Sequence, residues 1–349
     1  MIGVALGLLV AVLLITRQSG RVPSKSLTLL AESEGAIRAV AFQYTRETAP
    51  FTLPPIKAFL AQVESETEVV AVCGNEDDAA AARRAYAECK LRTVVVGKPI
   101  TGWCKDRFLV ARGEPAPLAY PKPSESGLAT RTNDSLVAPA LAAAYPKQFR
   151  TAQIPMDFDA GDILATGSHV IFSDSLWRKN GCPRGFRGTI ERLFRGKTVW
   201  LRGVPDHHIG MYAAPLDGRV AVVGDLEMGR RLWTKRMEAR FGKPDFSRET
   251  VRGFASAAEQ LRKAGYRLIR APEIVLAPKV YITYTNGVFE TRGSRRIVHM
   301  PLYGDATLDA AGRRAYESAG WEVRPIPVET VYRFRGTIGC LINVMERDP

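Results

Sequence analysis

Four residues that lie far apart in the sequence could together form one active site: Asp106, Asp159, His208 and Cys340. Cys340 follows a turn of small residues, Gly336-Thr-Ile-Gly, and precedes an apolar run. A thiol in such a turn can lie open beside backbone N–H groups, as a nucleophilic cysteine requires. A free cysteine is also a common small buried hydrophobe, and Cys340 alone does not separate these two interpretations.

Asp106 follows an apolar strand predicted at 93–97 and a glycine-containing turn. This order places the carboxylate at the carboxyl end of a βαβ unit, where α/β sheets bind ligands. A surface ion pair with Lys105 or Arg107 is the alternative interpretation.

Three acids lie close together at Asp157, Asp159 and Asp162, beside small residues. The twelfth position counted from Asp157 is Ser168, so the glutamate of an EF-hand calcium loop is missing, although magnesium binding stays open as an alternative. A carboxylate beside a glycine turn also suits a planar cation, because its two oxygens can accept from the arms of a guanidinium.

Two histidines, His207 and His208, are adjacent. A structural pair is the alternative to a functional one, and the further ligands of a zinc site are missing at short spacing. A histidine that titrates near neutrality can donate a proton to a leaving amine and hold a neighbouring cysteine as thiolate.

The composition is that of an ordinary folded protein, with 46% hydrophobic and 24% charged residues. The net charge of +13 comes from scattered basic residues, and no nucleic-acid-binding fingerprint accompanies them. We therefore expect no nucleic-acid partner. Five cysteines without paired spacing predict neither a disulfide framework nor a zinc cluster.

The first 35 residues differ from the rest. Residues 2–15 are apolar and uncharged, and a polar, basic tether follows. The apolar run is short for a full membrane span and fits a signal-peptide core or a short anchor. We expect a membrane-tethered or exported protein, periplasmic or extracellular, with this segment as the part that associates with a membrane. The side of the membrane stays open.

Residues 36–349 are predicted to form a single α/β domain. Strands are expected at 36–43, 68–73, 93–97, 199–201, 220–224, 267–269, 280–284, 296–300 and 322–326, and helices at 54–63, 79–89, 247–264 and 309–319. Strands that alternate with helices of this length indicate βαβ units. Residues 113–146, rich in proline, serine, glycine and alanine, are predicted to be a loop-rich insertion that covers a site.

The order of these motifs resembles the pentein superfamily of guanidino-group-modifying enzymes, and agmatine deiminase and bacterial peptidyl-arginine deiminase most nearly. Trp103-Cys-Lys-Asp106 is similar to the family's Trp-x-Arg-Asp, and Asp159-Ala-Gly-Asp162 to its Glu-Gly-Gly-Asn/Asp. His208-Ile-Gly210-Met211 is similar to His-x-Asp-Met, and the segment that ends at Cys340 to Gly-Gly-x-x-His-Cys. The stretch Tyr284-Thr-Asn286 also resembles the family segment ahead of the cysteine.

This resemblance implies a five-bladed, pseudosymmetric α/β propeller of ββαβ modules around a central acid-lined site, with no cofactor and no metal. Cys340 would attack the guanidinium carbon of a small guanidino compound or an arginine side chain, and His208 would protonate the departing amine. Asp159 would orient His208 and, with Asp106, bind the guanidinium nitrogens. Trp103, Asp162 and Asn286 would complete the substrate site.

The implied activity is that of a deiminase-type hydrolase that forms a covalent thiouronium intermediate. An amidinotransferase that uses an amine acceptor, or a catalytically silent pentein that binds a cationic partner, are the alternatives. Three positions depart from the family pattern: Gly210 replaces an aspartate, Asp159 is one methylene shorter than glutamate, and Gly339 replaces a histidine. The substrate is therefore expected to differ from free arginine or agmatine.

Overall fold

The structure is a computed structural model that describes residues 26–121, 129–276 and 279–348. The predicted N-terminal apolar segment lies outside these residues. Within the described ranges, no helix is both long and apolar enough to cross a membrane. The predicted anchor and the predicted location therefore stay predictions.

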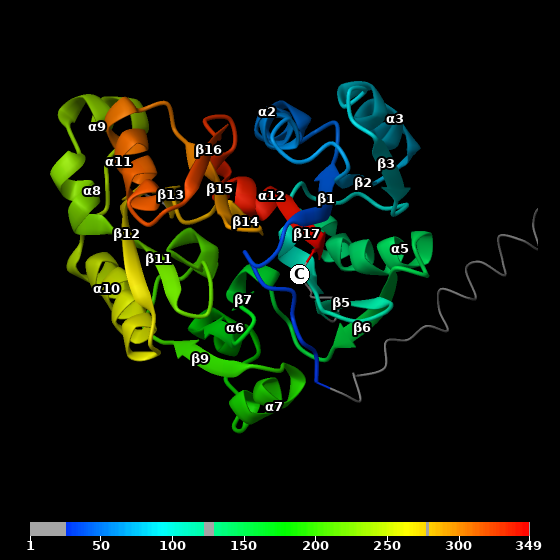
Figure 1. The fold of residues 1–349 in the computed structure, drawn as a ribbon, viewed down its shortest axis with the longest axis horizontal. Coiled ribbons are helices and arrows are strands. Elements are labelled where there is room, and N and C mark those ends of the chain that lie inside the picture. The colour runs from blue at the N-terminus through cyan, green and yellow to red at the C-terminus, as the bar shows by residue number, and fades with distance from the viewer. Residues whose placement is uncertain (1–25, 122–128, 277–278, 349) are drawn as a thin grey trace, which may run out of the picture.

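The described strands form five small sheets that share one pattern (Figure 1). In four sheets a strand pairs antiparallel with the next strand, and a helical crossover then leads the chain to a parallel neighbour. The first sheet has the same pattern, with the last described strand as the antiparallel partner of the first. Parallel pairing requires such a crossover, which explains the predicted alternation of strands and helices. The repeated arrangement confirms the predicted five-bladed α/β propeller.

The first sheet contains β17 (Ile342–Arg347), β1 (Ile37–Tyr44), β2 (Glu68–Cys73) and β3 (Leu91–Val95), with α2 (Ala49–Leu60) and α3 (Glu76–Ala85) as its helices. The second contains β4 (Leu109–Val110), β5 (Ala116–Pro121) and β6 (Phe149–Ile154), with α4 (Ala129–Asn133), the 3₁₀ helix η2 (Asp134–Leu136) and α5 (Val137–Ala144). The third contains β7 (Ile163–Ala165), β8 (His169–Ser173) and β9 (Lys197–Leu201), with α6 (Asp174–Lys179) and α7 (Phe186–Leu193).

The fourth sheet contains β10 (Ala213–Pro215), β11 (Val220–Asp225), β12 (Arg267–Leu276) and β13 (Val280–Thr283), with α8 (Leu226–Leu232), α9 (Lys235–Phe241) and α10 (Arg248–Lys263). The fifth contains β14 (Val288–Arg292), β15 (Arg295–Leu302) and β16 (Glu322–Pro327), with α11 (Ala306–Glu317). In Figure 1, α3, α7, α10 and α11 lie toward the outside of the ring.

Local sequence explains the longest helix, α10. The side chain of Ser247 accepts a hydrogen bond from the backbone N–H of Thr250 and so caps the first turn. The buried residues Gly253, Phe254, Ala257, Ala258 and Leu261 recur at helical spacing and form the face that packs inward.

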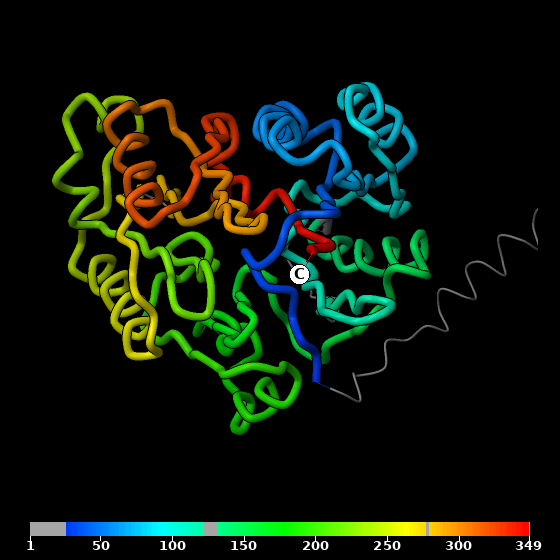
Figure 2. The backbone as a smooth tube through the Cα atoms, viewed as in Figure 1, coloured from blue at the N-terminus to red at the C-terminus, as the bar shows by residue number. Residues whose placement is uncertain are grey.

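The ring is closed by the last strand of the described chain. β17 pairs antiparallel with β1, and Ile342 lies opposite Phe42. Figure 2 shows the red C-terminal segment running beside the blue first strand. The module that begins the domain is therefore completed by the segment that follows Cys340.

Of the predicted loop-rich insertion at 113–146, the structure describes residues 113–121 and 129–146, and these hold β5, α4, η2 and α5 of the second module. Prolines at 117 and 121 disfavour a strand in isolation. In the fold, β5 nevertheless pairs with β4 on one side and with β6 on the other. Tertiary pairing thus outweighs the local composition.

Candidate active site

Each module brings one functional group to the centre from the same structural position, which is the residue or turn just before its first strand. Asp106 lies in η1 (Cys104–Arg107) before β4, and Asp159 caps η3 (Ala160–Asp162) before β7. His208 precedes η4 (Ile209–Met211) and β10, Asn286 precedes β14, and Cys340 lies in α12 (Ile338–Leu341) before β17. Because the modules repeat around one centre, these five residues lie close together although they are far apart in the sequence.

Sulfur, imidazole and carboxylate meet at this centre. One ligand atom from each of Asp106, His208 and Cys340 lies within 4.8 Å of the other two. His208 Nδ1 lies 3.7 Å from an oxygen of Asp106, and Nε2 lies 3.4 Å from an oxygen of Asp159. The four residues predicted to form one site are thus brought together.

The surroundings favour the charged form of His208. Burial lowers the pKa of the imidazole, but the nearby carboxylate of Asp106 and hydrogen bonds with Asp159 and Cys340 outweigh this effect. The pKa of His208 therefore stands well above its usual value. An imidazolium beside a thiol is the arrangement that stabilises a thiolate.

Asp159 is held as a carboxylate by cations from three elements. Burial raises the pKa of this group, yet His208, Lys179 and Arg131 together keep the pKa well below its usual range. Lys179 Nζ donates to Asp159 at 2.6 Å and to Asp162 at 2.5 Å, and Arg107 Nη1 donates to Asp159 at 3.1 Å. Lys179 and Arg107 were not predicted as site residues.

The glycine of the predicted acid–glycine turn allows His208 to approach. A Cβ at Gly161 would stand 2.5 Å from His208 Cγ and 2.7 Å from Nδ1, closer than real contacts allow. The imidazole therefore packs directly on the Gly161 backbone. This contact fixes the ring between Asp106 and Asp159.

Asn286 lies beside the cysteine. Cys340 Sγ donates to Asn286 Oδ1 at 3.4 Å, and the Thr337 hydroxyl donates to the same oxygen at 2.6 Å. A Cβ at Gly210 would stand 2.7 Å from Asn286 Nδ2. The amide of Asn286 therefore fills part of the space that the family aspartate would need at position 210.

The other two predicted substrate-binding residues have structural partners. Asp162 is fully buried, and its carboxylate accepts from Lys179 and from the Ser173 hydroxyl. The ring of Trp103 lies against Gly336, where an added Cβ would stand 2.5 Å from it. Trp103 thus supports the loop that leads to Cys340, and Asp162 supports the turn that holds Asp159.

A guanidinium from the chain itself occupies the space between the two central carboxylates. Arg131 Nη1 donates to Asp106 at 2.9 Å, and Nη2 donates to Asp159 at 2.7 Å. Sequence reasoning missed this residue, because α4 carries no recognisable motif and lies in the segment that was interpreted as loop. The contact nevertheless demonstrates that the two carboxylates have the spacing to bind a guanidinium.

Asp106, His208 and Cys340 also form a set of donors that a metal ion could use. The second oxygen of Asp106 already accepts from the guanidinium of Arg131. A metal ion there would need a neutral His208, because only an unprotonated ring nitrogen coordinates, whereas the surroundings of His208 favour the imidazolium.

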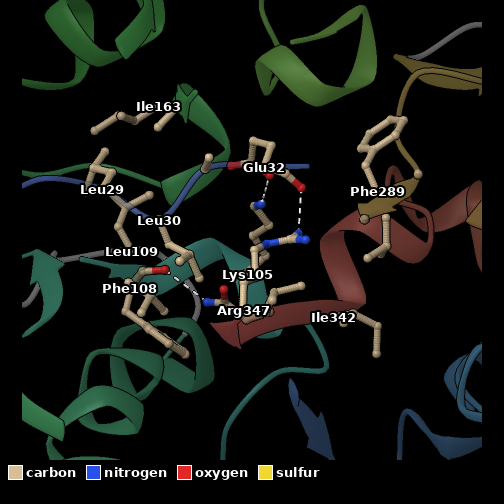
Figure 3. A pocket seen from close by; sticks show the side chains of 18 residues that line it. Leu29, Leu30, Glu32, Lys105, Phe108, Leu109, Ile163, Phe289, Ile342 and Arg347 are labelled. Atoms are coloured by element: carbon tan, nitrogen blue, oxygen red, sulfur yellow. Dashed lines mark hydrogen bonds and ion pairs between the residues drawn. The ribbon is translucent and has the colours of Figure 1, made fainter. Parts of the chain in front are cut away.

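A pocket reaches the centre between the modules, lined by Asp106, Gly161, His208, Asn286 and Cys340 among others. A neighbouring pocket shares Glu32 and Lys105 with it and extends toward Arg347. Figure 3 shows Lys105 and Arg347 approaching Glu32, whose carboxylate pairs with Lys105 and whose carbonyl accepts from Arg347 at 2.6 Å. Glu32 and Lys105 thus form part of the wall of both pockets.

No known family model matches the sequence, and no curated protein sequence matches it. Among solved structures, an agmatine deiminase from C. jejuni matches with a TM-score of 0.70 and 14% identity, covering 92% of this chain and 96% of that chain. A Cys-to-Ser variant of that enzyme with substrate bound matches with a TM-score of 0.69 and 14% identity, covering 94% and 98%. An agmatine deiminase from Enterococcus faecalis matches with a TM-score of 0.68 and 11% identity, covering 94% and 100%. The chain therefore has the fold of these agmatine deiminases, which is the fold that the order of its motifs led us to expect.

Proposed function

We propose that the protein is a cysteine-dependent hydrolase that acts on a guanidino group through a covalent thiouronium intermediate. The observation that carries this proposal is the guanidinium held between Asp106 and Asp159, beside His208 and Cys340. A pair of buried carboxylates provides charge-assisted acceptors for a planar cation. The proposal is supported by the position of the Cys340 thiol, which lies within 4.8 Å of ligand atoms of Asp106 and His208.

In the first half of the reaction, the Cys340 thiolate attacks the guanidinium carbon and a C–S bond forms. The C=N electron pair moves to nitrogen, and His208 donates its proton to the departing amine as the C–N bond breaks. The raised pKa of His208 keeps the imidazole protonated for this step. Asp106 and Asp159 hold the cation in place through both bond changes.

In the second half, neutral His208 removes a proton from water, and the oxygen attacks the thiouronium carbon. The C–S bond breaks and Cys340 leaves as thiolate, while a ureido product forms. The second proton of that water leaves the hydroxyl as the carbonyl forms and is taken up by the released ammonia or amine. One guanidinium and one water thus give a neutral ureido product and one ammonium, so atoms and charge balance. Asp159 stabilises the imidazolium that is regenerated at Nε2.

The test is an assay of the full chain against a panel of guanidino compounds: agmatine, arginine, arginyl peptides and methylated guanidines. Formation of a ureido product and release of ammonia without an added amine are expected, which also separates hydrolysis from amidino transfer. Cys340→Ala should lose activity by about 10³-fold or more.

Cys182→Ala is the matched control, because Cys182 is a free and exposed thiol. It should leave turnover and the Cys340-dependent alkylation by iodoacetamide unchanged. A wild-type chain that releases no product from any compound and has no alkylation that depends on Cys340 would overturn the proposed function.

A further inference from the structure

Arg131 makes the contacts that a substrate guanidinium is proposed to make. Its two terminal nitrogens donate to two carboxylates from different modules, Asp106 and Asp159. Burial lowers the pKa of the Arg131 guanidinium, but both carboxylates raise it, so the side chain stays cationic. The internal arginine therefore has the shape, the charge and the position of the proposed substrate group.

The guanidinium of Arg131 already lies between the two carboxylates, and each of their four oxygens already faces a cationic group. Asp106 uses one oxygen toward His208 and the other toward Arg131. One oxygen of Asp159 accepts from Arg131 and Arg107, and its other oxygen lies near Lys179 and His208. A guanidino substrate must therefore displace Arg131 before it can lie between these groups.

Arg131 differs from the other arginine at this carboxylate in a way that permits exchange. The side chain of Arg107 is 3% exposed, whereas that of Arg131 is 22% exposed. Arg131 also lies on a helix of only five residues, which packs on the adjoining η2. The side chain of Arg107 is thus buried in the interior, whereas that of Arg131 is partly exposed to solvent.

We propose that Arg131 is an internal competitor for the guanidinium site, so that the protein acts only on substrates that displace it. This inference rests on the proposed function. Exchange of one guanidinium for another gains no new ion pair, so a bare guanidinium group supplies no net affinity. The affinity must then come from the rest of the substrate, which selects guanidino compounds that carry additional binding groups.

We expect those groups to bind at the mouth next to His208. This mouth is lined by Ser175, Lys179, Asp206, His207, Lys279 and Arg335. Asp206 pairs there with Lys279 at 2.7 Å and with Arg178 at 2.9 Å. The rim is thus polar and offers both signs of charge to a substrate tail.

The inference is tested by calorimetric titration of the Cys340→Ala protein, which binds without turnover, with agmatine, arginine and the guanidinium ion as probes. If Arg131 occupies the site in about nine-tenths of molecules, R131A in this background should bind each probe about tenfold more tightly. The guanidinium ion, which lacks a tail, should bind measurably only when Arg131 has been removed.

Arg150→Ala is the matched control, because it removes an exposed arginine from β6 of the same module. It should leave every affinity unchanged. Should R131A fail to fold, R131Q removes the charge while keeping the length of the side chain, and should tighten binding in the same direction. Equal or weaker binding by both Arg131 variants would overturn the inference and make Arg131 a structural clamp.

Two further readouts separate this inference from the proposed function. If R131A binds the probes more tightly but neither wild type nor R131A turns over any compound, the proposed hydrolase is refuted and the competitor role of Arg131 is supported. If both proteins turn over substrate but R131A has unchanged affinity and unchanged KM, the competitor role is refuted and the hydrolase is supported. Peptide mass spectrometry should find an intact arginine at position 131, whereas a ureido group there would make Arg131 a substrate and overturn its role as competitor.

Discussion

Replacing Gly161 by alanine tests whether the position of His208 governs the chemistry. The backbone of Gly161 does not have a left-handed φ, so a methyl group would act through contact alone. That methyl carbon would stand 2.5 Å from His208 Cγ, whereas ordinary contacts lie at 3.4–4 Å. The imidazole must therefore retreat by about 1 Å, a displacement that can cost about 10²-fold in rate.

The assay compares kcat of wild type and Gly161→Ala on the best guanidino substrate. The pH profile of Cys340 alkylation is measured alongside, because it needs no substrate. We expect kcat to fall about 100-fold and the alkylation profile to move to higher pH, since a displaced imidazolium supports the thiolate less.

Gly188→Ala is the control for this experiment. Gly188 lies in α7, where the nearest atom to an added Cβ is Arg192 Nη1 at an ordinary 3.5 Å. This substitution should leave both measurements unchanged. If Gly161→Ala folds and matches wild type in rate and alkylation profile, the reasoning that places His208 at the chemical step is refuted.

Two further predictions concern the buried charges. Lys179→Met leaves the carboxylates of Asp159 and Asp162 without their shared cation, and should lower the free energy of unfolding in urea by about 3 kcal/mol. The control Lys147→Met removes an exposed lysine and should change the free energy of unfolding little. Equal stability of the two variants would contradict the role assigned to Lys179. Burial raises the pKa of Asp134 from 3.8 to about 6, so its stabilising contribution is complete below pH 3.8 and is lost as the pH rises through 6. Asp134→Asn stays neutral and should therefore lose less stability than wild type between about pH 4 and pH 7, by on the order of 3 kcal/mol in urea unfolding, and identical pH slopes would count against it.

The sequence was sufficient to predict the type of fold and the convergence of the site. The strands at 68–73, 220–224 and 322–326 are apolar runs bounded by turn residues, and the structure contains a strand at each of them. The order of the motifs predicted the meeting of Asp106, Asp159, His208 and Cys340, because each motif recurs at the same point of a repeated module.

The local pattern of apolar and polar residues could not predict the strands that directly follow these motifs. β4 has two residues, and β7 and β10 have three each, so no alternation can develop within them. Their existence depends on pairing with β5, β8 and β11, which is a tertiary effect. The same dependence on tertiary pairing explains why the strand β5 was not predicted within residues 113–146.

The cations around Asp159 were invisible for a different reason. Lys179 ends α6 and Arg131 lies in α4, and neither is near an acidic motif in the sequence. Basic residues are numerous in this chain, and only the fold distinguishes the few that turn inward. The pairing of Lys179 and Arg131 with Asp159 therefore becomes evident only in the three-dimensional structure.

The pairing of β17 with β1 ties the reactivity of the protein to its assembly. The segment that delivers Cys340 is also the one that completes the first sheet. During synthesis the thiol emerges last, and it meets His208 only when the ring has closed. Activated alkylation of Cys340 at neutral pH therefore reports on completion of the fold. Weakening the edge between Phe42 and Ile342 should lower this reactivity to that of an ordinary free thiol, while every other group of the site is still present.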